Sequence, residues 1–268
     1  MSSNLGAAMH FFPNTRVHDA YSWCYNTTCN TFGSLRSGIY DRIITSFTTI
    51  WYKSVLECVD DDSHLLDVGV GTGAALVANA DIIKRKRLHI VGVDYDAAYI
   101  ERCQQLIDMH DLKNHIEAVC CSFYDYPEAS CTKVADDGVE PQTNTNTLGN
   151  SVDSVTFDNI YFSGSFMIFP DKEAALRKAA SLLSSRTMGR MYFTQTFELS
   201  RNWLLECIKP KLSYWTTIDF GEVTYVNVFE DVLNGGDVET VKVVQIDDGK
   251  AVVGVRESRL VVAKCRDM

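Results

Sequence analysis

The 268-residue sequence has no run of about eighteen apolar residues, the length that a membrane-spanning helix needs. It also lacks an excess of basic charge, because 25 Lys and Arg stand against 35 Asp and Glu and give a net charge of −10. A surface of that sign repels a phosphate backbone, so naked nucleic acid is disfavoured as a substrate. No charged segment followed by an apolar one begins the chain, which argues against secretion.

The nine cysteines show no spacing that would mark a zinc site, and no metal is expected. Their odd number predicts reduced thiols inside a cell. The cytoplasm is the favoured compartment, while the short, acid-poor N-terminus leaves a mitochondrial presequence open. With 46% hydrophobic residues, the chain is large enough for one α/β domain with additions.

The most informative stretch is Leu65–Gly73, L-L-D-V-G-V-G-T-G, an apolar run with one acid that breaks into alternating glycines. An apolar strand that leads into such a turn, with a helix behind it, holds a nucleotide-like ligand against bare backbone. Gly69, Gly71 and Ala74 also satisfy the dinucleotide fingerprint. The carboxylate of Asp67 would repel the phosphates of a dinucleotide, whereas S-adenosylmethionine carries an ammonium and a sulfonium that the same acid would attract.

This stretch resembles motif I of the class I S-adenosylmethionine-dependent methyltransferases, and Ile90–Asp96, I-V-G-V-D-Y-D, resembles the second-strand motif that follows it. The resemblance covers roughly residues 40–264, and Val70 replaces the usual small residue or cysteine of motif I. It implies an α/β fold with an open, mostly parallel seven-stranded sheet, helices on both faces and an antiparallel final strand. It also implies S-adenosylmethionine as the cofactor.

Apolar periodicity supports the same architecture, because strands alternate with helices along the chain. Residues 1–38 are expected to form a helical or irregular N-terminal cover, and residues 39–268 the cofactor-binding domain. Residues 131–154, rich in Asn, Thr, Asp and Gly, predict a flexible polar insertion. Strands are expected over residues 65–69, 88–94, 115–121, 157–163, 188–196, 238–246 and 259–264, and helices over 39–59, 73–84, 97–110, 171–184 and 199–209.

Neighbouring parallel strands end at one edge of a sheet, so the loops after the first four strands are expected to line one cleft. The resemblance implies that the backbone at Gly69, Gly71 and Gly73 approaches the methionine part of the cofactor, where any Cβ would block it. Asp67 would face the ammonium group. Asp94, at the end of the second strand, would accept hydrogen bonds from both ribose hydroxyls.

The adenosine end of the cofactor is expected to contact Tyr95. Ser122 stands where the family commonly has an acid that binds the adenine amino group, and Phe123 would stack on the base. Ser163 opens the loop S-G-S-F that is expected beside the sulfonium and the acceptor.

Three aromatic residues, Tyr21, Tyr40 and Phe166, are expected to line the acceptor pocket, where a ring attracts a sulfonium. No catalytic residue is assigned, because methyl transfer needs the acceptor in line and deprotonated only when its pKa requires it. The N-P-P-Y, D-P-P-Y and Lys-Asp-Lys-Glu signatures are missing from the sequence. The acceptor stays open between a small molecule and a protein side chain.

Two other functions remain open. The first is a methyltransferase-fold assembly factor with a vestigial cofactor site, docked on a ribonucleoprotein or another protein through residues 131–154. Val70, Ser122 and the basic run Lys84–Arg87 motivate it, although that run also complements the dipole of the helix that it closes. The second is a nicotinamide-dependent oxidoreductase, which Asp67 disfavours.

Overall fold

The structure is a computed structural model, and it describes residues 48–127, 132–133, 155–185, 188–200, 223–249 and 255–266. The predicted cover over residues 1–38, with Tyr21, and the predicted pocket residue Tyr40 lie outside the described residues. So do most of the insertion over residues 131–154 and most of the predicted helix over residues 199–209.

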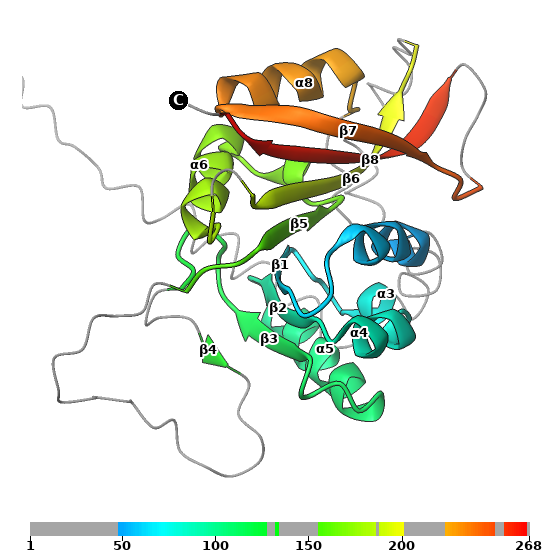
Figure 1. Cartoon of the computed structure of the whole chain (residues 1–268), viewed down its shortest axis with the longest axis vertical. Helices are drawn as coiled ribbons and strands as arrows, with labels where there is room; N and C mark the ends of the chain where they lie inside the picture. Colours follow the sequence, from blue (N-terminus) through cyan, green and yellow to red (C-terminus); the bar gives the residue numbers. More distant parts are fainter. Residues whose placement is uncertain are drawn as a thin grey trace, which may run out of the picture. The chain divides into compact units, whose positions relative to one another are not determined.

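The described residues form one open, mostly parallel sheet in the order β4-β3-β2-β1-β5-β6-β8-β7 (Figure 1). The seven expected strands are confirmed, and β8 is antiparallel to both β6 and β7. An eighth strand, β4, pairs antiparallel with β3 at the edge, so two residues of the insertion extend the sheet. The strands are β1 His64–Val68, β2 His89–Asp94, β3 Ile116–Cys120, β4 Thr132–Lys133, β5 Asn159–Ser163, β6 Arg190–Glu198, β7 Val238–Ile246 and β8 Arg256–Cys265.

The helices differ from the sequence prediction in two places. The helix expected over residues 73–84 is two helices, because Asn79 lies between them and its amide donates to the carbonyl oxygens of Ala75 and Thr49, at 2.9 and 3.2 Å. Helix α8 was not predicted. Residues 48–58 are helical, and the other helices are α3 Ala74–Val77, α4 Ala80–Lys86, α5 Ala97–Met109, the 3-10 helix η1 Phe166–Ile168, α6 Lys172–Leu182 and α8 Val226–Gly235.

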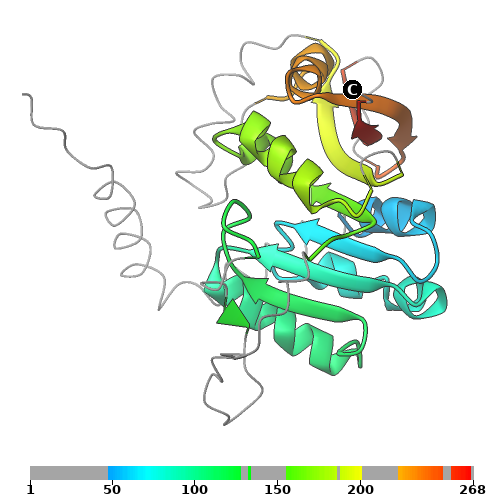
Figure 2. The same cartoon turned by 60° about the vertical axis from the view of Figure 1, so that its left-hand side comes forward.

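The two faces of the sheet carry separate hydrophobic clusters, because successive side chains of a strand point to opposite sides. Leu65 packs with the helix over residues 48–58 and with α3–α5, whereas Leu66 packs with α6 and α8. Figures 1 and 2 show the two groups of helices on opposite sides of the strands. Asp67, next in the alternation, therefore faces the helix over residues 48–58.

One expectation from composition is corrected. Cys121, directly after β3, is disulfide-bonded, so the prediction that the cysteines are reduced thiols does not hold at this position. Cys58, Cys103, Cys120 and Cys265 form no disulfide. None of the described helices combines the length and the apolar character that crossing a membrane requires.

Candidate functional site

The loop between β1 and α3 has a backbone that only glycine adopts easily. Gly69, Gly71 and Gly73 have φ values of 80°, 58° and 69°. Residues with a Cβ are strained in this left-handed region, whereas glycine is not. The alternating glycines therefore set the path of the loop from the strand into the helix.

The three glycines differ in what surrounds them. A Cβ at Gly69 would lie 2.8 Å from Cβ of Ser165, in the loop after β5, and a Cβ at Gly73 would overlap Sγ of Cys103 on α5. A Cβ at Gly71 would meet no heavy atom within 4 Å. Close packing thus accounts for two of the glycines that the sequence interpretation assigned to the ligand, and the space above Gly71 is open.

Asp67 is a fully buried carboxylate beneath this loop. Its Oδ2 accepts a hydrogen bond from the hydroxyl of Tyr52 at 2.7 Å, and its Oδ1 has no hydrogen-bond partner. Burial, with the charge of Asp94 as a smaller cause, raises the pKa of Asp67 to about 7, although the Tyr52 hydroxyl opposes the shift. An unpaired buried acceptor is unfavourable, so Oδ1 is suited to a ligand that brings a hydrogen-bond donor or a positive charge.

Asp94 connects the glycine loop to the end of β2. Its Oδ2 accepts a hydrogen bond from the backbone N–H of Gly71, and its Oδ1 accepts one from Asp96, both at 3.0 Å. Burial raises the pKa of Asp94, and these backbone donors oppose the shift. A carboxylate offers about four lone pairs, so Asp94 retains acceptor capacity for hydroxyl groups.

The other predicted cofactor and acceptor residues lie in two kinds of surroundings. Tyr95, directly after Asp94, is 82% exposed. In contrast, Phe123 and Phe166 are buried, and their rings both pack edge to face against Phe162. Core packing accounts for these two phenylalanines, so their contacts with a cofactor or an acceptor stay predictions.

Two serines of the prediction are half-buried. Ser163 lies within hydrogen-bonding reach of the hydroxyls of Tyr52 and Tyr161. The backbone carbonyl of Ser122 accepts hydrogen bonds from the N–H groups of Asp125 and Tyr126, which fixes the turn after β3. Of these two serines, only Ser163 thus lies near a residue that contacts Asp67.

Sequence reasoning missed the helix over residues 48–58 as part of the site. Its apolar spacing indicated a packing helix, and it does pack on the sheet. It also places Tyr52 on Asp67, with the Tyr52 and Tyr161 ring centroids 5.0 Å apart. The adjacent Trp51 donates from Nε1 to Oδ2 of Asp248 at 3.0 Å. Two adjacent polar aromatics shortly before the glycine motif were the one available signal.

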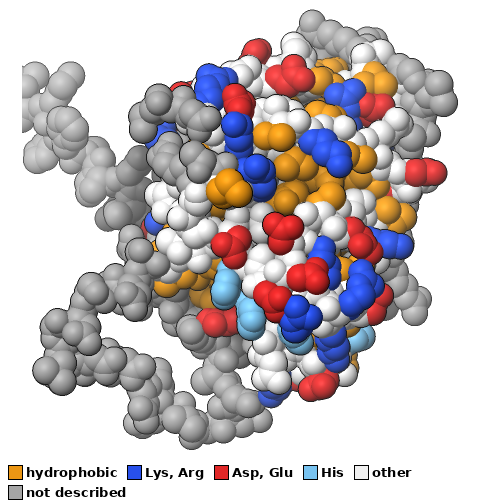
Figure 3. All heavy atoms as spheres, in the orientation of Figure 1, with side chains coloured by type: hydrophobic (Ala, Val, Ile, Leu, Met, Phe, Trp, Pro, Cys, Tyr) orange, Lys and Arg blue, Asp and Glu red, His pale blue; other side chains and the backbone are white. Residues whose placement is uncertain are grey.

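The basic run at the end of α4 is held by local partners. Lys84 donates to the carbonyl of His110, Arg85 pairs with Glu57, and Arg87 makes two contacts with Asp62. Figure 3 shows Lys, Arg, Asp and Glu side chains interspersed on one face of the molecule. These contacts match the interpretation of the run as a helix end and give no support to the assembly factor that the run motivated.

Lys86 is expected to stabilise the fold more than its neighbours in the run. Its Nζ donates to the carbonyl oxygens of Leu56 and Glu57, at 3.1 Å each, and to that of Val59, which closes the end of the helix over residues 48–58. Lys86→Met is expected to lower the free energy of unfolding by ~1.5–3 kcal/mol, the range for hydrogen bonds to charged groups. Urea denaturation measures the loss, and Lys84→Met, which changes a more exposed side chain, is expected to cost less.

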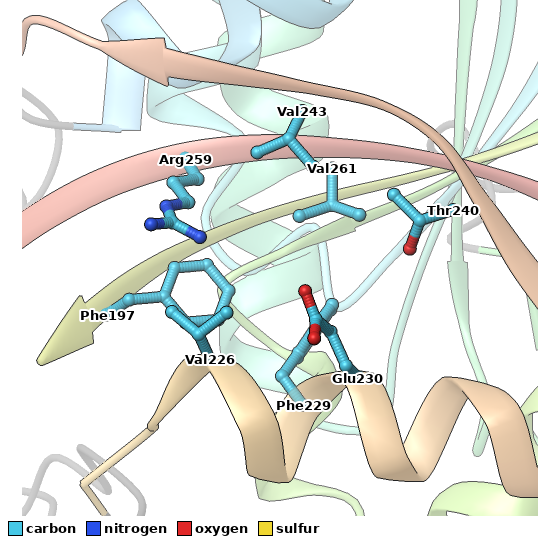
Figure 4. A pocket seen from close by; sticks show the side chains of 8 residues that line it. All are labelled: Phe197, Val226, Phe229, Glu230, Thr240, Val243, Arg259 and Val261. Atoms are coloured by element: carbon cyan, nitrogen blue, oxygen red, sulfur yellow. The ribbon is translucent and has the colours of Figure 1, made fainter. Parts of the chain in front are cut away.

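A small cavity lies between α8 and the strands β6–β8, far along the sheet from the glycine loop. Phe229 and Glu230 on α8 face Thr240, Val243 and Val261 on the strands (Figure 4). The volume of about 10 Å³ has room for roughly one water molecule. This cavity is therefore too small for a methyl acceptor. Within the described part of the chain, no group of three or more His, Cys, Asp or Glu is placed to hold a metal ion.

Comparison with known proteins finds a family model that matches the chain and a curated protein that resembles part of it. A family model described as "Methyltransferase domain" matches residues 59–216, more than half of the chain. A carboxy-S-adenosyl-L-methionine synthase from Psychromonas ingrahamii is 28% identical over 81 residues, 30% of this chain and 32% of that protein. The chain thus matches only about a third of the length of this curated relative.

Three solved structures of similar fold are each 12% identical to this chain. They include the [4+2]-cyclase SpnF, with a TM-score of 0.57 over 82% of both chains. A geranyl diphosphate methyltransferase in complex with SAM has a TM-score of 0.56 over 81% of this chain and 85% of that one. A Galdieria sulphuraria protein assigned as a sarcosine dimethylglycine methyltransferase has 0.55 over 81% and 84%. At this identity the likeness establishes the fold alone.

Proposed function

Because the chain belongs to the methyltransferase domain family, with S-adenosylmethionine as its cofactor, we propose that it transfers a methyl group to a small molecule or a protein side chain by in-line displacement. The observation that carries this proposal is Oδ1 of Asp67, a buried carboxylate oxygen with no partner beneath the glycine loop. The cofactor supplies an electrophilic methyl group on a sulfonium and, at its amino-acid end, an ammonium group.

The described residues fit that cofactor in charge and in shape. Asp67 Oδ1 would accept a hydrogen bond from the ammonium group, and the open space above Gly71 would receive the amino-acid part. Asp94 would use its remaining lone pairs for the ribose hydroxyls, and Tyr95 offers an exposed ring to the adenine. Ser122 and Phe123 stay predictions for the base.

The acceptor has to reach the loop after β5. Ser163 is the last residue of β5, and Ser165 donates from Oγ to the carbonyl of Val68 at 2.6 Å, which holds this loop against the end of β1. An acceptor atom held about 3 Å from the methyl group, in line with the breaking bond, gains most of its rate from orientation. The protein's task at this point is therefore to position the acceptor and exclude water.

A dinucleotide fits the same loop less well. The carboxylates of Asp67 and Asp94 both lie at the glycine loop, where a pyrophosphate would add like charge. The partners of the basic run and the short match to curated proteins give no support to an assembly factor. SpnF, a cyclase of similar fold, is the reason to measure cofactor binding and methyl transfer separately.

Isothermal titration calorimetry on the full chain tests the proposal. S-adenosylmethionine and S-adenosylhomocysteine, which both carry the ammonium group, are expected to bind in a one-to-one ratio, whereas NAD is expected not to bind. Radiolabelled methyl transfer to metabolite and protein fractions then tests the chemistry. A folded protein that binds NAD, or neither cofactor form, would contradict the proposal.

A further inference from the structure

Strand β6 extends past the C-terminal end of its neighbour β5, on the side of the sheet where the parallel strands end and ligands bind. β5 ends at Ser163, which pairs with Thr194, whereas β6 continues to Glu198. Residues 195–198, at roughly 3.3 Å each, carry β6 about 13 Å further. Open α/β sheets bind ligands at this carboxyl edge, so this β6 extension flanks the path by which an acceptor reaches the loop after β5.

One face of the β6 extension is polar and continues the surroundings of Asp67. Thr194 Oγ1 lies 2.8 Å from the hydroxyl of Tyr161, whose ring packs against Tyr52. Side chains alternate along a strand, so Thr196 and Glu198 share this face with Thr194. The same face of the sheet therefore leads from the glycine loop to Glu198.

Trp51 lies across the middle of this face. A Cβ at Gly164, in the loop after β5, would be 3.3 Å from its Cζ3. Its Nε1 donates to Asp248, which also accepts a hydrogen bond from Oγ of Ser258 on β8 at 2.6 Å. Ser258 pairs with Thr196 of the β6 extension. Between the loop after β5 and Glu198, the side chains on this face of the sheet are thus aromatic in the middle and polar at the far end.

Glu198 has an unused buried oxygen. Its side chain is 6% exposed, and its Oε1 accepts a hydrogen bond from Nε of Arg256 and forms an ion pair with Nη2, both at 2.5 Å. Its Oε2 is buried with no partner. Among the described residues, the only other buried side-chain atom in this condition is Oδ1 of Asp67. Both orphan oxygens lie on one face of the sheet, and a hydrogen-bond donor from a ligand would satisfy each.

We propose that Oε2 of Glu198 accepts a hydrogen bond from an N–H or O–H group of the methyl acceptor, at the end away from the methylated atom. This inference rests on the proposed methyl transfer and specifies the chemical class of the acceptor. Arg256 already neutralises the carboxylate, so the group that Glu198 receives is an uncharged hydroxyl, amide or amine. The acceptor is a polar molecule long enough to span the β6 extension.

The test uses the full chain saturated with S-adenosylhomocysteine and two probes, phenol and anisole, that share a ring and differ in the O–H donor. Glu198→Gln keeps the size of the side chain, and Arg256 orients the amide oxygen toward itself, so an N–H group replaces Oε2. Saturation-transfer NMR is expected to show phenol binding to the wild type at least fivefold more tightly than to Glu198→Gln. Anisole is expected to bind weakly and equally to both.

Glu257→Gln is the matched control, because Glu257 pairs with Arg259 and lies next to the Glu198 partner on β8, on the other face. It is expected to leave phenol binding unchanged. Glu198→Asp, which keeps the charge and withdraws the oxygen, is expected to weaken phenol binding as well, and it serves if Glu198→Gln misfolds.

Several outcomes overturn the inference: no saturable phenol binding, equal binding of phenol and anisole to the wild type, or an equal loss in Glu257→Gln. Calorimetry with S-adenosylhomocysteine on the same samples separates the two proposals. If the wild type does not bind S-adenosylhomocysteine, the proposed function is rejected. If S-adenosylhomocysteine binds and phenol binds equally to the wild type and to Glu198→Gln, only the proposed role of Glu198 is rejected.

Discussion

Asp67→Asn is expected to weaken the binding of S-adenosylhomocysteine roughly tenfold to a hundredfold, the equivalent of a charge-assisted hydrogen bond of ~1.5–3 kcal/mol. The same change is expected to raise the melting temperature of the ligand-free protein at pH 8. Burial disfavours the charged form of Asp67, and the asparagine keeps an oxygen for the Tyr52 hydroxyl while it removes the charge. Calorimetry and thermal melts on both proteins measure the two effects.

The stability difference has a predictable dependence on pH. The pKa of Asp67 is about 7 in the folded protein, above the ordinary value of 3.8. The folded wild type therefore keeps a proton that the unfolded chain has lost, and its stability falls as pH rises from about 4 to 7, by at most ~1.4 kcal/mol per unit. Asp67→Asn lacks this group, so its advantage grows through that window and is constant above it.

The groups around Asp67 do not change this sign. Tyr52, Tyr161 and Cys103 have pKa values raised mainly by burial, so they stay neutral in the window. The pKa of Asp94 is also raised, but this group is present in both proteins and cancels in the difference.

Cofactor affinity is expected to follow the ionisation of the same carboxylate. Binding of the ammonium group requires Asp67 to lose its proton, so wild-type affinity falls about tenfold per unit below pH 7. Tyr52→Phe removes the hydrogen bond that lowers the pKa of Asp67, and the break in the affinity profile moves to higher pH. Parallel pH profiles for the wild type and Asp67→Asn would exclude Asp67 from the site.

The fold was largely predictable because its signals are local. Alternating apolar strands, the glycine turn after β1 and the Asp171 cap, whose carboxylate accepts from Ala174 N–H at 2.8 Å, are all readable over a few residues. The break at Asn79 was not, since one of its partners, Thr49, is thirty positions away in the chain. Helix α8 begins V-N-V-F, and such β-branched and aromatic residues favour strands, whereas the helix buries Phe229 and Leu233, which are four positions apart.

In the candidate site, too, some residues belong to local motifs that the sequence reveals, and others join only through tertiary contacts. Asp67, Gly71 and Asp94 belong to two short motifs, and the structure joins them through the Gly71 N–H. Tyr52 and Glu198 enter through tertiary contacts that no local pattern encodes. Glu198 in particular is one acid among many in the sequence, and its significance comes from the length of β6 relative to β5.

Gly73→Ala is expected to lower the free energy of unfolding by about 2–5 kcal/mol, whereas Gly71→Ala is expected to lose less stability and to lose cofactor affinity. An alanine is strained at either position, by ~1–2 kcal/mol, because both φ values are positive. At Gly73 the new methyl group also overlaps Sγ of Cys103, which adds about 1–3 kcal/mol of overpacking. At Gly71 the methyl group enters open space, where it would displace the cofactor. Urea denaturation and calorimetry with S-adenosylhomocysteine separate the two losses.

A double-mutant cycle with Cys103→Ala isolates the overlap, because contacting residues show a coupling energy and independent ones do not. Cys103→Ala is expected to recover part of the stability lost in Gly73→Ala and none of the loss in Gly71→Ala. Full cofactor affinity in Gly71→Ala would mean that the open space above Gly71 is not where the amino-acid end binds. The glycine motif would then serve the packing of its loop against β5 and α5, and Asp67 Oδ1 would need another ligand.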